Sequence, residues 1–175
     1  MQVFDWRHIT EEHGPRVWRI AYRLLGNHSD AADCFQETFL AALEVSRRQP
    51  VRNLRGMLVR LATTRAIDRL RQRSRQERHQ ALAQEARRES GWGNDPADHA
   101  QSGELAGRLR DAISELPAQE AKAFCLRYFS EMSYRQIAKE LDIKTSAAGV
   151  LLHRAKARLR ERLAPEAVPI DEVTR

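Results

Sequence analysis

The chain has 175 residues, of which 42% are hydrophobic and 31% are charged, and its formal net charge at pH 7 is +6. This length suffices for one ordinary domain or for two small ones. The excess of positive charge favours a polyanionic partner. No apolar run approaches the roughly 20 residues that a membrane-spanning helix needs, and the charged residues Asp5, Arg7, Glu11 and Glu12 argue against a signal peptide. We therefore expect a cytoplasmic protein that does not insert into a membrane.

The cysteines and histidines do not form a recognisable reactive site. Cys34 and Cys125 lie far apart, each among apolar neighbours, as reduced core thiols of a cytoplasmic protein do. His8, His13 and His28 lie near acidic residues, but their spacing matches no known ligand or catalytic motif. The sequence therefore predicts no metal, no cofactor and no enzymatic activity.

The first half of the chain has the periodicity of three helices. Apolar residues recur on one face from Glu11 to Leu25, and Gly26 ends this helix. Ser29 is the predicted N-cap of the second helix and Asn53 that of a long third helix. The second helix is expected to bury Ala32, Phe35, Phe39, Ala42 and Leu43. The third is expected to bury Leu54, Met57, Leu58, Leu61, Ala62, Ala66 and Leu70.

The helical pattern fades after Arg78, and residues 91–103 are typical of a linker. Leu105–Leu116 is amphipathic, and Pro117 suits the first position of the next helix. The face of that helix consists of Ala121, Phe124, Cys125 and Tyr128. Two prolines after residue 164 predict a loose tail.

Residues 134–152 have the spacing of a helix-turn-helix. Ser133 and Gln136 form a capping box for a short helix that ends near Leu141. Asp142 occupies the turn position that often needs a left-handed backbone. Thr145 is the predicted cap of a last helix, which would place the residues after it near base edges. A generic helical hairpin is the alternative.

A basic segment runs from Arg47 to Arg88. It contains thirteen arginines, no lysine and three acidic residues, a net charge of +10. Arginine suits bidentate contacts with phosphate and guanine. The alternative is a solvated helix face, but such faces usually mix charges of both signs. The segment therefore predicts contact with a nucleic acid.

The segment before it is acidic, because Ser29–Ser46 contains neither Lys nor Arg. Asp33, Gln36, Glu37 and Leu40 share one helix face, while Phe35 and Phe39 are expected to point to another. An acidic face would repel DNA, so we interpret it as a protein-docking surface. An ordinary exposed helix side is the alternative.

These features, in this order, resemble the extracytoplasmic-function (ECF, group IV) sigma factors of the sigma-70 superfamily. The resemblance covers residues 13–163. The strings that carry it are Arg23–Gly26, Asp33–Leu40, Arg65–Arg71, Glu115–Pro117, Ser133–Ala138 and His153–Leu159.

The resemblance implies an all-α protein of two small domains that binds RNA polymerase core and directs promoter-specific transcription initiation. Residues 1–88 correspond to sigma region 2, 89–103 to a flexible linker, 104–164 to the helix-turn-helix of region 4, and 165–175 to a loose tail. The implied polymerase partners are the clamp coiled coil and the flap, with Asp33, Gln36, Glu37 and Leu40 on the clamp. An anti-sigma factor is a further implied partner.

The resemblance also assigns promoter contacts to both domains. In region 2, minus-ten binding and melting would involve Arg47, Arg48, Arg52, Asn53, Arg55, Arg60, Thr64, Arg65, Arg69 and Arg71. In region 4, minus-thirty-five binding would involve Arg135, Lys144, Thr145, Ser146, Ala147, Val150, His153 and Arg154. The chain departs from the family pattern at Met57, at Thr64 and at residues 149–151, which affects fine promoter readout.

One further expectation concerns DNA. Residues 146–152 contain no long polar side chain, so upstream base readout should be weak and tolerant of thymine. The alternative function is a stand-alone helix-turn-helix repressor or activator, which would leave the acidic face and the separate basic segment without a role.

Overall fold

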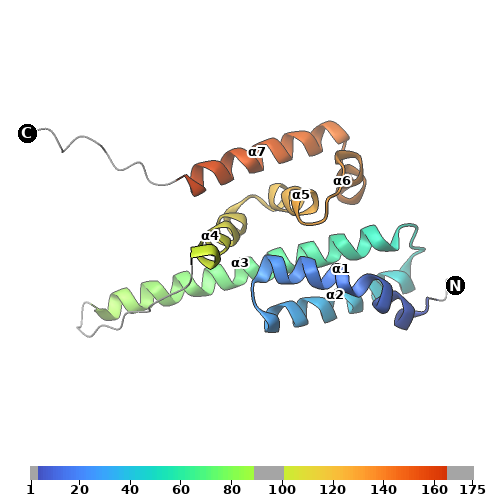
Figure 1. The fold of residues 1–175 in the computed structure, drawn as a ribbon, viewed down its shortest axis with the longest axis horizontal. Helices are drawn as coiled ribbons and strands as arrows, with labels where there is room; N and C mark the ends of the chain where they lie inside the picture. Colours follow the sequence, from blue (N-terminus) through green and yellow to red (C-terminus); the bar gives the residue numbers. More distant parts are fainter. Residues whose placement is uncertain (1–3, 89–100, 165–175) are drawn as a thin grey trace, which may run out of the picture.

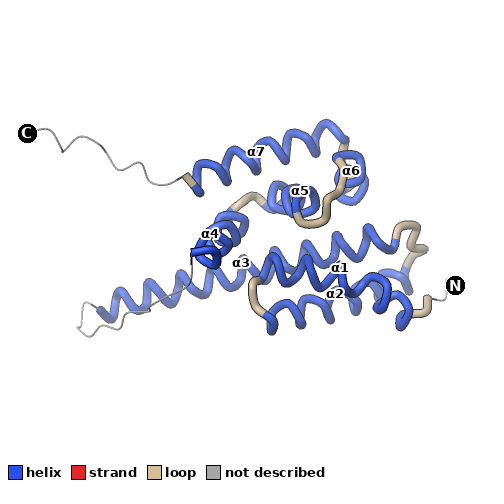
Figure 2. Tube along the Cα trace, in the orientation of Figure 1, coloured by secondary structure: helices blue, strands red, loops and turns tan. Residues whose placement is uncertain are grey.

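The structure, a computed structural model, describes residues 4–88 and 101–164. Residues 89–100 of the predicted linker and the predicted tail, 165–175, lie outside the described residues. The described part contains α-helices and no strand, as predicted (Figure 2). Helices α1 to α3 form one group and α4 to α7 a second group beside α3 (Figure 1).

Helix α1 (Trp6–Leu25) begins five residues before the predicted start at Glu11. The Asp5 carboxylate accepts hydrogen bonds from the backbone N–H groups of Arg7 and His8, which satisfies donors that a helix start leaves unpaired. Gly26 ends the helix in the left-handed conformation, with φ of 74°, as predicted.

Helix α2 (His28–Arg48) corrects two expectations. Its N-cap is Asn27 and not Ser29, because the Asn27 side chain accepts from the Asp30 N–H at 2.8 Å. Of the predicted buried stripe only Ala42 is buried, and the buried residues are Ala31, Cys34, Thr38, Ala41 and Ala42. Small side chains line the close contact of three helices, while the Phe35 and Phe39 rings pack together at its edge, with centroids 4.9 Å apart.

Helix α3 (Leu54–Arg88) begins after Asn53, whose side chain accepts from the Gly56 N–H at 3.0 Å, so the predicted cap is confirmed. The helix continues past Arg78, where the periodicity fades. Its buried face is wider than predicted, since Val59 and Ile67 are also buried and Leu54 and Leu61 only partly so. The reason is that α3 contacts α1 and α2 and also the second helix group.

The second group consists of α4 (Gln101–Glu115), α5 (Ala118–Tyr128), α6 (Tyr134–Leu141) and α7 (Thr145–Leu163). Helix α4 begins at Gln101, so its first three residues lie within the predicted linker. Pro117 is the N-cap of α5 and not its first helical residue. The position before α7 belongs to Lys144 and has no side-chain cap, so the predicted Thr145 cap is wrong.

Helices α6 and α7 form the predicted helix-turn-helix. The Ser133–Gln136 capping box is present, and Asp142 has a left-handed backbone with φ of 53° and ψ of 50°. Ile137, Ala138, Ala148 and Leu152 are buried between the helices of this group. No helix among residues 4–88 and 101–164 is both long and apolar enough to span a membrane.

Candidate nucleic-acid and protein interfaces

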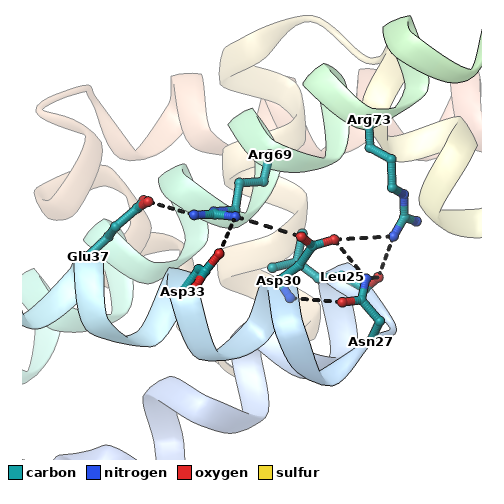
Figure 3. A network of polar contacts seen from close by, with 7 residues as sticks. All are labelled: Leu25, Asn27, Asp30, Asp33, Glu37, Arg69 and Arg73. Carbon is teal, nitrogen blue, oxygen red and sulfur yellow. Dashed lines mark hydrogen bonds and ion pairs between the residues drawn. The ribbon is translucent and has the colours of Figure 1, made fainter.

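Three acidic residues of α2, namely Asp30, Asp33 and Glu37, form a row that faces arginines of α3 (Figure 3). Arg69 reaches all three acids, with nitrogen–oxygen distances of 2.6 Å to Glu37, 3.3 Å to Asp33 and 3.7 Å to Asp30. Arg65 adds a second contact with Glu37 at 3.5 Å. The sequence did not show that the basic segment neutralises the acidic face across two helices. Arg65 and Arg69, both predicted DNA contacts, thus have protein partners in this structure.

An exposed apolar groove borders this row. It is lined by residues of α1 and α2, namely Trp6, Thr10, Phe35, Gln36, Phe39, Leu40 and Leu43. Leu40, which lines this groove, is 61% exposed. Phe39 and Gln36 therefore border one surface, although they were expected on different faces. Trp6 and Thr10 were missed because α1 was predicted to begin at Glu11.

The ten predicted minus-ten residues fall into two sets. Arg47, Arg48, Arg52 and Arg55 are exposed where α2 ends and α3 begins, without an ion pair to any described residue. The other set has partners or is partly covered: besides Arg65 and Arg69 it comprises Asn53, Arg60, Thr64 and Arg71. Only the first set is open to a nucleic acid in this arrangement.

The helix-turn-helix presents a continuous exposed surface. Of the eight predicted region 4 residues only Ala147 is half-buried, and the others are exposed around α6 and the start of α7. Val150 is 48% exposed. A Cβ at Gly149 would lie 3.8 Å from the Tyr134 ring, an ordinary contact, so packing does not require glycine there.

Both cysteines are buried and free, as predicted. Burial raises the pKa of Cys34 to about 11 and also raises the pKa of Cys125. Across residues 4–88 and 101–164, no group of three or more His, Cys, Asp and Glu side chains is placed to hold a metal ion.

Comparisons with known proteins match both helix groups. Residues 9–76 match sigma-70 region 2, and residues 106–159 match sigma-70, region 4. The chain is 31% identical over 160 residues to the ECF RNA polymerase sigma factor SigE of Mycolicibacterium smegmatis, covering 91% of this chain and 62% of that protein. It is 27% identical to the ECF RNA polymerase sigma factor SigW of Bacillus subtilis, covering 89% of this chain and 87% of that protein.

Two solved structures share the fold. One is the sigma factor RpoE in complex with the anti-sigma factor NepR from Bartonella quintana, with 23% identity and a TM-score of 0.56, covering 94% of this chain and 99% of that one. The other is CnrH in complex with the cytosolic domain of CnrY, with 19% identity and a TM-score of 0.58, covering 90% and 86%. With region 2 followed by region 4 along one chain, and with similarity to ECF sigma factors over most of its length, the protein belongs to the sigma-70 family.

Proposed function

We propose that this protein binds RNA polymerase core in the cytoplasm and directs promoter-specific transcription initiation as a group IV sigma factor. The observation that supports this most is the presence of region 2 and region 4 in one chain, the second with an exposed helix-turn-helix. The first relative is longer, since the chain spans 62% of its length. A stand-alone repressor or activator is not favoured, because it has no use for region 2.

The proposed clamp-docking surface is the row Asp33, Gln36, Glu37 and Leu40. Asp33 and Leu40 are both well exposed, with 57% of the Asp33 side chain and 61% of Leu40 accessible. The groove beside them supplies apolar area, which a charged row alone lacks. For the flap we propose the open apolar groove of α4, α5 and α7, lined by Leu109, Phe124, Tyr128, Leu159 and Leu163.

The proposed minus-ten surface begins with Arg47, Arg48, Arg52 and Arg55, which are exposed where α2 ends and α3 begins. It extends to Asn53, Arg60, Thr64, Arg65, Arg69 and Arg71 when promoter DNA is bound. The proposed minus-thirty-five surface is the exposed set on α6 and α7, namely Arg135, Lys144, Thr145, Ser146, Ala147, Val150, His153 and Arg154.

Core binding by charge-reversed variants tests the proposal. Asp33→Lys should weaken binding to core polymerase by about 1–3 kcal/mol, the scale of an interfacial charge loss. Asp33 is a cleaner probe than Glu37, because Glu37 lies closer to Arg69, at 2.6 Å against 3.3 Å for Asp33, and also contacts Arg65. The matched control is Glu161→Lys, an exposed position of α7. Equal core affinity for both variants would contradict the docking surface, and no core binding by the unmodified chain would contradict the function.

We also propose regulation by an anti-sigma factor that covers the polymerase-facing surfaces. The support is the shared fold with two sigma factors whose structures contain such partners or a bound cytosolic domain. Copurification from the native host under conditions where the factor is silent should recover an inhibitory protein. Constitutive activity of the factor at normal expression levels, with no protein recovered, would contradict this.

A further inference from the structure

The second domain covers part of the proposed minus-ten surface of the first. Glu140, on α6, lies 87 residues from Asn53 in sequence, yet its Oε1 accepts a hydrogen bond from Asn53 Nδ2 at 2.8 Å. Its other oxygen lies 3.8 Å from Arg60 Nε. Only 11% of the Glu140 side chain is accessible, which is little for a carboxylate outside an ion-binding site. A single acidic side chain of region 4 therefore contacts two proposed DNA-binding residues, Asn53 and Arg60.

The start of α3 is shaped to receive this carboxylate. The dipole of a helix favours an anion near its N-terminus, while the Gly56 N–H donates to the Asn53 side chain at 3.0 Å. A Cβ at Gly56, in the first turn of α3, would overlap Glu140 Oε1 and Asn53 Nδ2. Glycine costs about 1 kcal/mol in a helix relative to alanine, and here its missing side chain makes room for the Glu140 carboxylate.

A second set of contacts joins the domains farther along α3. Arg71 donates hydrogen bonds to the carbonyl oxygens of Leu116 at 2.7 Å and Ser114 at 3.3 Å, where α4 ends. Arg78 lies 3.5 Å from Glu115. Arg71 is another proposed minus-ten residue, so three members of that set are engaged by region 4 at once.

The interface around Glu140 is polar and incompletely filled. A cavity between the start of α3 and α6 is lined by charged and polar residues that include Arg16, Arg55, Gln136 and Lys139. Polar interfaces between domains of one chain separate more readily than apolar ones. The contact around Glu140 is therefore suited to reversible opening, whereas farther along α3 the two helix groups meet through buried apolar residues.

We propose that Glu140 takes the place of a DNA phosphate at the start of α3, so that region 4 closes over the minus-ten surface until polymerase and promoter displace it. The inference rests on the proposed function, because it assigns regulation to the same surface. It predicts that the isolated full-length factor binds DNA more weakly than a variant in which region 4 no longer covers the minus-ten surface.

Distance measurements on the free full-length chain test the closure without polymerase or promoter. Spin labels on Gln49→Cys and Gln119→Cys report the separation of the domains, since both positions are exposed and the native thiols are buried. The unmodified background should give one narrow distance distribution. Glu140→Ala removes both polar contacts and Gly56→Ala fills the space for the carboxylate, so each should broaden the distribution and shift it to longer distances. Glu161→Ala is the control that should match the background.

A binding measurement tests whether the closure competes with DNA. The probe is a 5′-labelled single-stranded DNA of random sequence, measured at low salt. Glu140→Ala should bind it about three- to tenfold more tightly than Glu161→Ala, although both variants remove one negative charge. Distance distributions that stay at the background in both Glu140→Ala and Gly56→Ala, or equal DNA affinity for the two glutamate variants, would overturn the proposal. Failure of the proposed function would appear separately, as absence of core binding.

Discussion

At the scale of single residues, the two cysteine thiols are fully buried in the core. Cys34 and Cys125 have no accessible surface, and burial raises the pKa of Cys34 to about 11 from its ordinary value of 9.0. The thiolate is the reactive form, so alkylation of the folded protein by iodoacetamide at pH 8 should be far slower than alkylation in urea. The raised pKa of the folded state also means that the contribution of the Cys34 thiol to stability is fully present below pH 9 and is lost as pH rises toward 11. Rapid alkylation of the folded chain would contradict the burial.

Arg69 is the residue on which the charge balance of the first domain depends. Its side chain is 26% accessible and lies within 3.7 Å of Asp30, Asp33 and Glu37 of α2. Arg69→Met should lower the free energy of unfolding by about 1–2 kcal/mol, because Asp33 loses its arginine partner while Glu37 and Asp30 keep contacts with Arg65 and Arg73. Urea denaturation measures this. Arg75→Met, at an exposed position of the same helix, should change stability by much less, and equal losses would contradict the role of Arg69.

At the scale of elements, the start of α7 sets the quality of upstream readout. The exposed residues there are Thr145, Ser146 and Val150, with His153 and Arg154 one turn later. None of the first three can make the bidentate contacts that discriminate bases by about 1–3 kcal/mol each. Scanning every base of the upstream element in a binding assay should therefore give small losses. Several positions that each cost more than about 2 kcal/mol would contradict weak readout.

The elements also show which sequence signals were sufficient. The Ser133–Gln136 capping box, the Asp142 turn and the Asn53 cap were predictable, because each depends on a side chain and its own neighbours. The buried face of α2 was not, because α2 presents small residues to two helices and leaves its phenylalanines at the rim. The start of α1 differs from the prediction, because Asp5 caps the helix five residues before the apolar periodicity begins at Glu11.

At the scale of the whole molecule, the pairing of charges could not be predicted along the chain. The basic segment and the acidic helix were separate observations, and only the packing of α2 on α3 shows that Arg65 and Arg69 serve both. The contact between Asn53 and Glu140 joins two predicted domains, and neither periodicity nor motif spacing indicates it. Domain identities follow from local motifs, whereas contacts between domains depend on tertiary geometry.

Run-off transcription with purified core polymerase over a promoter library tests the central proposal most directly. The factor should confer transcription from a small class of promoters that share minus-ten and minus-thirty-five elements. Asp33→Lys should reduce the yield from all of them, because the loss of docking energy does not depend on promoter sequence. Glu161→Lys should leave the yield unchanged. Transcripts no different from those of core alone, with a folded factor that binds core, would contradict the assignment of this chain as an initiation factor.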